Sequence, residues 1–93
     1  MNKGEAKAVL TAELARYRVQ TYVGLQRLLD TQDTFEVTGP SGTKYQLEIQ
    51  AMWDSNRGGN LRVMGSIDDF GWRAFCPLND DFIMDPDGRF VGE

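Results

Sequence analysis

Acidic side chains occur in closely spaced pairs near the end of this chain, and their type and spacing could bind a cation. The pairs are Asp68 and Asp69, Asp80 and Asp81, and Asp85 and Asp87. Aspartate stabilises tight turns through its own carboxylate, and glycine supplies the positive φ that several turn types require. Each pair therefore has an ordinary interpretation as part of a turn. The alternative is a calcium or magnesium site assembled from two turns, with the candidate ligands Asp68, Asp69, Asp85 and Asp87.

Catalytic and cofactor-binding motifs are missing from the sequence. An EF-hand is excluded, because aligning its glycine with Gly88 puts Ile83 at the first ligand position, which must supply an oxygen. Histidine, the usual proton-transfer residue near neutral pH and the commonest transition-metal ligand, is absent. The strand pattern points the single cysteine, Cys76, into the core, where a free cysteine behaves as a small hydrophobe. We therefore expect a protein without catalytic residues or a cofactor.

The charge distribution limits the class of partner. The formal net charge is −4, and residues 66–93 hold seven acidic side chains against two basic ones, whereas residues 1–65 are nearly balanced. An acidic surface repels nucleic-acid phosphates and anionic lipid, and it favours basic partners or divalent cations. We expect a protein partner rather than DNA, RNA or a membrane.

Length and composition predict one cytoplasmic domain over residues 1–93. The chain is 41% hydrophobic, which is typical of a globular fold with one core. No stretch approaches the roughly 20 apolar residues of a membrane span, and the first residues lack the apolar run of a secretory signal. A single cysteine cannot form an internal disulfide, which suits a reducing compartment.

Residues 3–30 have the periodicity of one long helix. They contain no proline, and apolar side chains recur at helical spacing at Leu10, Leu14, Tyr17, Leu25 and Leu28. At about 100° per residue these side chains form a single stripe, so we expect that side of the helix to face a sheet.

The opposite side of this helix carries small apolar residues where a solvated face is usually more polar. They are Ala8, Ala12, Ala15 and Val19. One interpretation is that alanine is the best helix former, which needs no partner. The other is self-association, with a second copy of the chain packing on this stripe in a symmetric homodimer.

From Thr34 onward the apolar period changes from 3.6 residues to 2, which predicts strands. The expected strands are residues 34–38, 43–53, 61–67 and 72–78, with a short final hairpin formed by 82–84 and 89–91. Turn-like sequences separate them, so consecutive strands should be antiparallel. The predicted fold class is α+β, in which one long N-terminal helix packs on an antiparallel meander of four to six strands over residues 34–93.

The short loops also predict the register of the sheet. Around the loop at 54–60, Trp53 should face Leu61 and Ala51 should face Val63. Around the turn at 68–71, the expected pairs are Ile67 with Trp72, Gly65 with Ala74, and Val63 with Cys76. Small residues would then meet along the middle of the sheet and form a shallow groove for the helix.

This register brings large apolar side chains together on the outer face, away from the helix. Met64 would lie opposite Phe75, with Met52 diagonal to Met64, and Arg62 and Arg73 beside them. Such a cluster can mark a partner surface, and methionine adapts to many partners. The alternative is that residues 82–93 fold back and cover the cluster.

The order of one helix followed by a meander resembles the cystatin arrangement, although the Gln-x-Val-x-Gly inhibitory motif of that family does not occur in this chain. A shared architecture does not imply a function. The leading hypothesis is a small non-catalytic protein-binding or regulatory module that uses the outer face. The second is a divalent-cation or small-ligand domain that uses the C-terminal aspartates. An enzyme is the third class.

Overall fold

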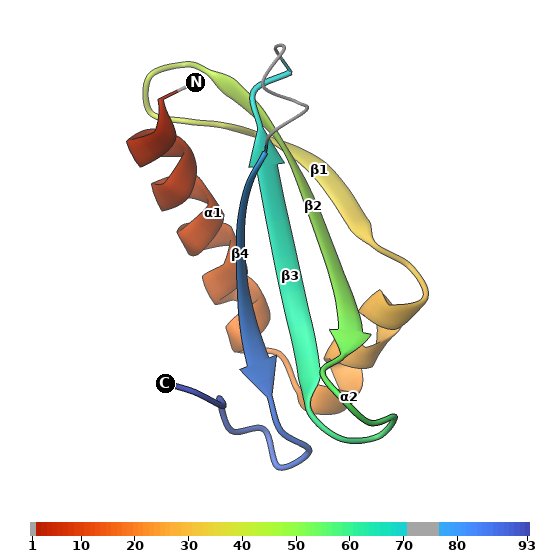
Figure 1. Cartoon of the computed structure of the whole chain (residues 1–93). Coiled ribbons are helices and arrows are strands. Elements are labelled where there is room, and N and C mark those ends of the chain that lie inside the picture. The colour runs from red at the N-terminus through yellow and green to blue at the C-terminus, as the bar shows by residue number, and fades with distance from the viewer. Residues whose placement is uncertain (1, 71–76) are drawn as a thin grey trace.

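The computed structural model describes residues 2–70 and 77–93 and confirms the α+β fold class. Within these ranges the helical elements are α1 (Lys3–Arg18), α2 (Tyr22–Leu25) and the 3₁₀ segment η1 (Gln26–Leu29). The strands are β1 (Asp33–Thr38), β2 (Lys44–Trp53), β3 (Leu61–Asp68) and β4 (Leu78–Met84). They form one antiparallel sheet in the order β1-β2-β3-β4 (Figure 1). No helix in the described part of the chain is long and apolar enough to cross a membrane.

The N-terminal helical region is divided near residue 20, whereas the sequence predicts one helix over 3–30. The side chain of Asn2 caps α1 by accepting from the backbone N–H of Glu5, and the helix ends at Arg18. Thr21 has extended backbone angles, and its hydroxyl accepts from the N–H of Gly24. Threonine favours such capping over a helix interior, so the chain turns here and starts a second short helix.

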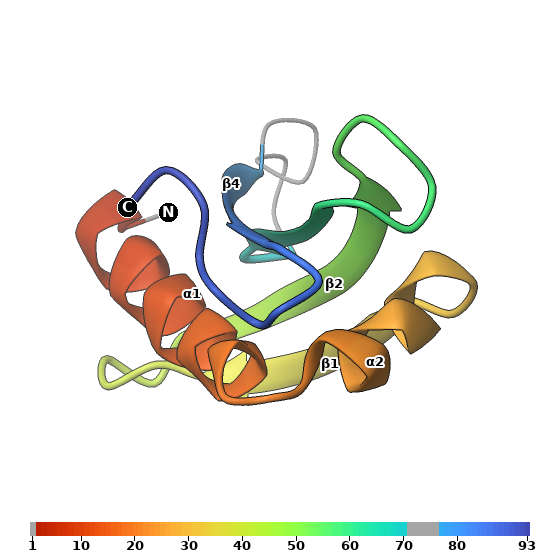
Figure 2. The ribbon, with the colours of Figure 1, turned by 90° about the horizontal axis from the view of Figure 1, so that it is seen from below.

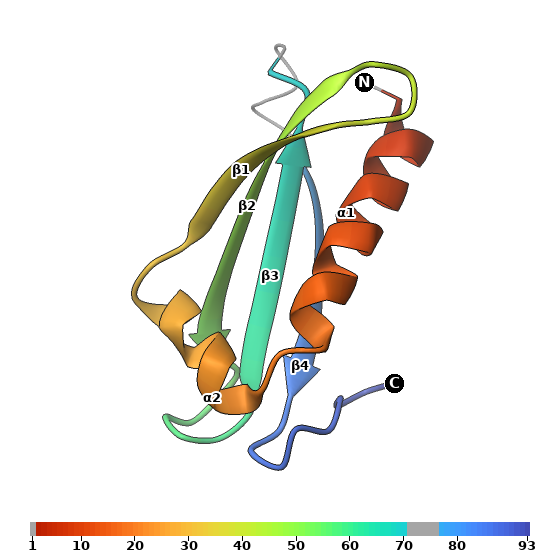
Figure 3. The same ribbon diagram turned by 180° about the vertical axis from the view of Figure 1, so that it is seen from behind.

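The two helical regions lie on the same face of the sheet but over different strands. α1 packs against β3 and β4, whereas η1 packs against β2 (Figures 2 and 3). Apolar side chains from both regions are buried, including the five of the predicted stripe: Leu10, Leu14, Tyr17, Leu25 and Leu28. The break near residue 20 therefore lets one helical stripe cover a sheet that is wider than a single helix.

The close approach of α1 to the sheet depends on Gly65. A Cβ atom at Gly65 would lie 2.9 Å from Cδ1 of Leu10, 3.1 Å from Cδ1 of Ile49 and 3.2 Å from Cδ2 of Leu14. Real Cβ atoms essentially never show the first of these distances, and the other two are tighter than most Cβ contacts, so neighbouring side chains would have to shift. Gly65 therefore provides part of the groove for the helix that the sequence predicts.

The predicted register of β2 against β3 is confirmed, because Trp53 pairs with Leu61 and Ala51 pairs with Val63. The predicted register on the other side of β3 is wrong. There Ile67 pairs with Leu78, Gly65 with Asp80 and Val63 with Phe82. These partners lie six residues later in the chain than expected, since β4 begins at Leu78 and the connection from β3 is longer than a tight turn. Residues 72–76 of the predicted strand lie outside the described residues.

The residues expected to form a final hairpin belong partly to β4. Phe82 and Met84, in the last three residues of β4, are buried on the inner face and complete the core. A turn follows, in which the N–H of Asp85 donates to the carbonyl of Arg89 at 2.8 Å, and a single bridge joins Met84 to Phe90. The hairpin is thus real but short.

The C-terminal segment folds toward α1 rather than over the outer face (Figure 2). The guanidinium of Arg18 lies 4.9 Å from the ring centroids of both Phe82 and Phe90. Its NH1 also donates to both carboxylate oxygens of Glu93, at 2.8 and 2.7 Å. The described C-terminal residues therefore leave the outer face of the sheet uncovered.

Candidate functional site

The outer face of the sheet carries the two described methionines of the predicted cluster. Met64 of β3 pairs with Gln50 of β2, and Met52 of β2 pairs with Arg62 of β3. The two methionines are therefore diagonal neighbours, as expected. Met52 is 50% exposed, whereas Met64 is partly buried. On its other side Met64 pairs with Asp81 of β4, and not with Phe75 as the sequence predicts. Phe75 and Arg73 lie outside the described residues.

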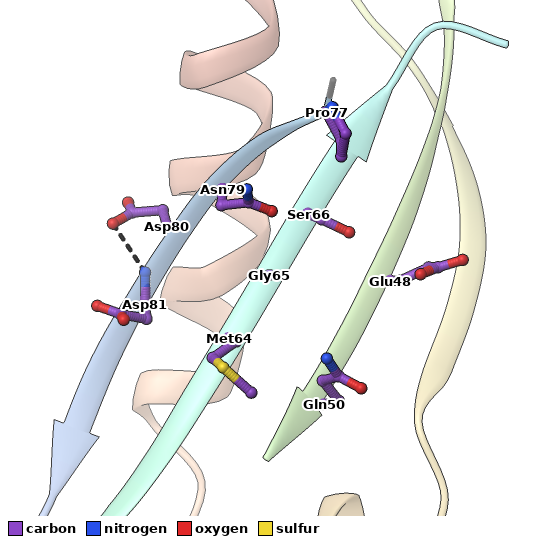
Figure 4. A pocket seen from close by; sticks show the side chains of 9 residues that line it. All are labelled: Glu48, Gln50, Met64, Gly65, Ser66, Pro77, Asn79, Asp80 and Asp81. Carbon is purple, nitrogen blue, oxygen red and sulfur yellow. Dashed lines mark hydrogen bonds between the residues drawn. The ribbon is translucent and has the colours of Figure 1, made fainter. Parts of the chain in front are cut away.

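A hollow of about 420 Å³ lies on this face over β2, β3 and the start of β4 (Figure 4). Its lining residues are Glu48, Gln50, Met64, Gly65, Ser66, Pro77, Asn79, Asp80 and Asp81. The volume falls within the range of about 300–1,000 Å³ that is usual for ligand sites, although this hollow is open to solvent. The sequence predicts Asp80 and Asp81 in a turn, but they lie within β4.

The negative charge in this hollow is only partly compensated. Arg62 donates to Asp81 through NH1 and to Asp54 through NH2, the latter at 2.8 Å. The hydrogen bonds to Asp54 and Asp81 raise the pKa of the Arg62 guanidinium above its ordinary value. In the part of the chain that the structure describes, Glu48 and Asp80 form no ion pair. Asp80 pairs with Gly65 and lies on the helix side of β4, so Glu48 is the carboxylate on the outer face at the hollow that has no paired cation among the described residues.

The acidic turns that could have formed one cation site lie far apart. Asp68 ends β3 and accepts from the N–H of Phe70 at 2.9 Å. Asp85 follows β4 and accepts from the N–H groups of Asp87 and Arg89, each at 2.9 Å. Because β3 and β4 are antiparallel, these turns lie at opposite ends of the sheet, more than about 20 Å apart. The structure does not bring Asp68 and Asp69 together with Asp85 and Asp87.

No group of three or more His, Cys, Asp or Glu side chains that could hold a metal ion occurs among residues 2–70 and 77–93. The carboxylate of Asp85 already accepts two backbone N–H groups, as expected for turn chemistry. The ordinary interpretation as turn residues therefore accounts for Asp68 and Asp85.

The small-residue stripe of α1 faces away from the sheet. Ala8, Ala12, Ala15 and Val19 are all exposed, and Val19 is 85% exposed. Val23, in the neighbouring α2, is 75% exposed. The stripe for which the sequence predicts self-association is thus exposed on the described part of the molecule.

A three-residue polar cluster that the sequence did not predict joins α1, η1 and β1. The hydroxyl of Tyr17 donates to Oδ2 of Asp33 at 2.6 Å, and Arg27 donates to both carboxylate oxygens of Asp33 at 2.8 Å. The Arg27 hydrogen bond, followed by that of Tyr17, lowers the pKa of Asp33 to about 2. Burial, followed by the bond to Asp33, raises the pKa of Tyr17. These groups satisfy one another, which is typical of a structural clip.

A second cluster joins the first turn of α1 to the connection between β1 and β2. The carboxylate of Glu5 accepts from the hydroxyl of Tyr45 at 2.7 Å, from the hydroxyl of Ser41 at 2.7 Å and from the N–H of Ser41 at 3.0 Å. The bonds from Tyr45 and Ser41 lower the pKa of Glu5. Burial, followed by the bond to Glu5, raises the pKa of Tyr45 to about 12. Sequence spacing carries no signal for this contact, because it joins residues 40 positions apart.

Unlike these two clusters, the hollow and the methionines on the outer face do not join the described helices to the strands. No protein-family model, curated protein or solved structure matches this chain. The two internal clusters hold the helices and strands together, whereas Glu48 forms no ion pair among the described residues and Met52 is 50% exposed. The outer face is the candidate functional site.

Proposed function

We propose that this protein is a small, non-catalytic protein-binding or regulatory module that acts through the outer face of its sheet. The observation that carries the proposal is that the described helices lie on one face of the sheet, while the other face holds a hollow and a half-exposed methionine. An antiparallel sheet can leave one face in water, and that face is then usually polar. Apolar side chains within such a face are typical of a contact surface.

The composition of the face also supports this proposal. Met52 and Met64 are neighbours on adjacent strands, and glutamine, asparagine and acidic side chains surround them. Protein interfaces commonly have an apolar centre with a polar rim, and methionine can repack against different partners. The strands that present these residues are hydrogen-bonded on the sheet, so the surface is held in a fixed shape before it binds.

We place this function in the cytoplasm and expect neither a nucleic acid nor a membrane as the partner. Support comes from the single cysteine, which cannot form an internal disulfide, and from the net charge of −4. We further propose that a second copy of the chain occupies the stripe of Ala8, Ala12, Ala15 and Val19, which is separate from the outer face.

Affinity capture from a lysate of the native cells tests the binding function. The wild type should retain a specific protein, and Met52→Asp should lose it, because a charge at a half-exposed contact residue must be desolvated on binding. Val23→Asp is the matched control, since it places the same charge on an exposed valine of the helical side. Circular dichroism should show that all three proteins are folded. Equal capture by Met52→Asp and the wild type would contradict the proposal.

A further inference from the structure

We infer that the free edge of β1 binds an extended segment of a partner protein, which adds to the sheet as a further strand. In the described sheet β1 is the outermost strand at one border, and β4 is outermost at the other (Figures 1 and 3). This edge is separate from the hollow over β2, β3 and β4. It is therefore a second binding surface, in addition to the outer face.

Every second residue of β1 directs its backbone N–H and C=O groups away from β2. The N–H of Gly39 donates to the carbonyl of Thr43 at 2.8 Å, so Gly39 turns its backbone groups toward β2. Because this direction alternates along a strand, the backbone groups of Thr34, Glu36 and Thr38 point to the free edge. Among the described residues no hydrogen bond reaches these groups. They have the spacing that a further strand requires.

The edge of β4 is protected in ways that the edge of β1 is not. The outward carbonyl of Ile83 accepts from the N–H of Val91 at 2.9 Å, so the C-terminal segment covers this end of β4. The N–H of Asp81, which also points outward, donates to Oδ1 of Asp80 at 2.8 Å. In the described structure β1 has neither protection, contains no proline and pairs with β2 over six residues without a bulge. Proteins usually block sheet edges that bind nothing, so this contrast favours strand addition at β1.

Apolar side chains on the helix side of β1 are left partly exposed. Phe35 and Val37 are only partly buried, whereas Leu47 and Tyr45, their partners on β2, are 0% exposed. Side chains directly opposite each other on neighbouring strands lie about 4.5–5.5 Å apart. An added strand would therefore bury apolar surface of Phe35 and Val37 as well as pair with the backbone of β1.

A hollow of about 430 Å³ lies between α1 and the turn that follows β1. Its lining residues are Glu5, Ala8, Val9, Ala12 and Pro40. The carboxylate of Glu5 already accepts from Tyr45 and Ser41, so the remaining lining is apolar. This hollow, which we call the apolar hollow, favours an apolar side chain from the added strand.

A hollow of about 450 Å³ lies between α1, η1 and the first residues of β1, and it is more polar. Its lining residues are Arg16, Tyr17, Gln20, Arg27, Asp33 and Phe35. Side chains on one face of a strand repeat every two residues, so two side chains about four residues apart could reach both hollows. We therefore expect an extended segment of about six residues, with an apolar side chain near Pro40 and a polar one near Asp33.

The test is a selection of random peptides, displayed on phage, against the folded wild-type protein. Enriched peptides should share an apolar residue with a polar residue about four positions away. A synthetic peptide from this set should bind Glu36→Pro at least about tenfold more weakly, because proline removes an outward N–H and its ring blocks the close approach of a strand. Asn79→Pro makes the same change at an outward position of β4 and should bind like the wild type. Melting curves should show that both variants are folded.

Changes in the peptide and in the apolar hollow give readouts that are specific to strand addition. In a scan of single N-methyl groups along the peptide, binding should weaken at every second amide, because only alternate amides face β1. Ala12→Trp fills the apolar hollow and should weaken binding about tenfold. Ala15→Trp, at an exposed position of α1 outside this hollow, is the control and should bind normally.

Several outcomes would overturn the inference. An absence of enriched peptides, peptides that bind Glu36→Pro like the wild type, or N-methyl effects without alternation would each exclude strand addition at β1. A wild-type dimer that Glu36→Pro converts to a monomer in light scattering would assign the edge to a second copy of the chain and also overturn it. Met52→Asp should bind the peptides normally, so this result and its capture experiment test the two surfaces separately.

Discussion

At the scale of single residues, the carboxylate of Asp33 has the most consequential environment in the described structure. It accepts two hydrogen bonds from Arg27 and one from Tyr17, so three helical and strand elements meet at one charge. These bonds favour the ionised form, which is why the pKa of Asp33 falls from 3.8 to about 2. A group whose pKa is lowered by folding makes the folded state more stable at pH values where it is ionised in both states.

We expect Asp33→Asn to lower the free energy of unfolding at neutral pH by about 1–2 kcal/mol, a value reduced from the full pKa shift because Arg27 is half exposed. The contribution of Asp33 is fully present above about pH 4 and is lost as the pH falls from 3.8 through about 2. The difference between wild type and variant in urea unfolding should therefore shrink across that window. Asp30→Asn, at an exposed aspartate nearby, is the control. A difference that stays constant down to pH 2 would contradict this account.

At the scale of elements, the contact between α1 and β3 depends on a residue without a side chain. We expect Gly65→Ala to destabilise the protein by about 1–3 kcal/mol, because the added methyl group must displace Leu10, Ile49 or Leu14 in a packed core. Ser66→Ala, on the opposite face of the same strand, should change stability by less than about 0.5 kcal/mol. Thermal unfolding of both variants measures the effect, and equal melting temperatures would show that α1 can move away without cost.

The division of the helical region near residue 20 is also decided at the scale of elements. Thr21 and Gly24 form a local cap, which the apolar periodicity of residues 3–30 does not reveal. Helical periodicity reports which side chains are buried, and the buried residues on either side of the break keep the same period. The break changes the direction of the chain, so that α1 and η1 cover different strands of the sheet.

At the scale of the whole molecule, self-association through α1 makes a prediction about mass. A homodimer built on Ala8, Ala12, Ala15 and Val19 should have twice the chain mass of 10.5 kDa in light scattering, and Val19→Glu should return it to the monomer. Met52→Glu is the control, because it adds the same charge to the outer face. A monomer mass for the wild type would rule out this interface, and a dimer unaffected by Val19→Glu would move it elsewhere.

The sequence by itself predicted much of the architecture. Alternation over residues 43–53 and 61–67 indicated two strands with their inner faces, and the loop at 54–60 was short enough to predict that Trp53 pairs with Leu61. It also predicted that Met52 and Met64 are diagonal neighbours, which is part of the candidate site. These features depend on side-chain spacing within one strand or across one short loop, and such spacing is a local property of the chain.

Only the tertiary structure decided which segment forms β4, because several apolar runs near the end of the chain could have paired with β3. The choice of Leu78–Met84 brings Phe82 and Met84 into the core, and it places Asn79 and Asp81 across β3 from Glu48 and Gln50. The cluster of Asp33 likewise joins side chains from separate elements. Such contacts depend on how helices and strands pack on one another, and packing brings together residues whose distance along the chain carries no periodic signal.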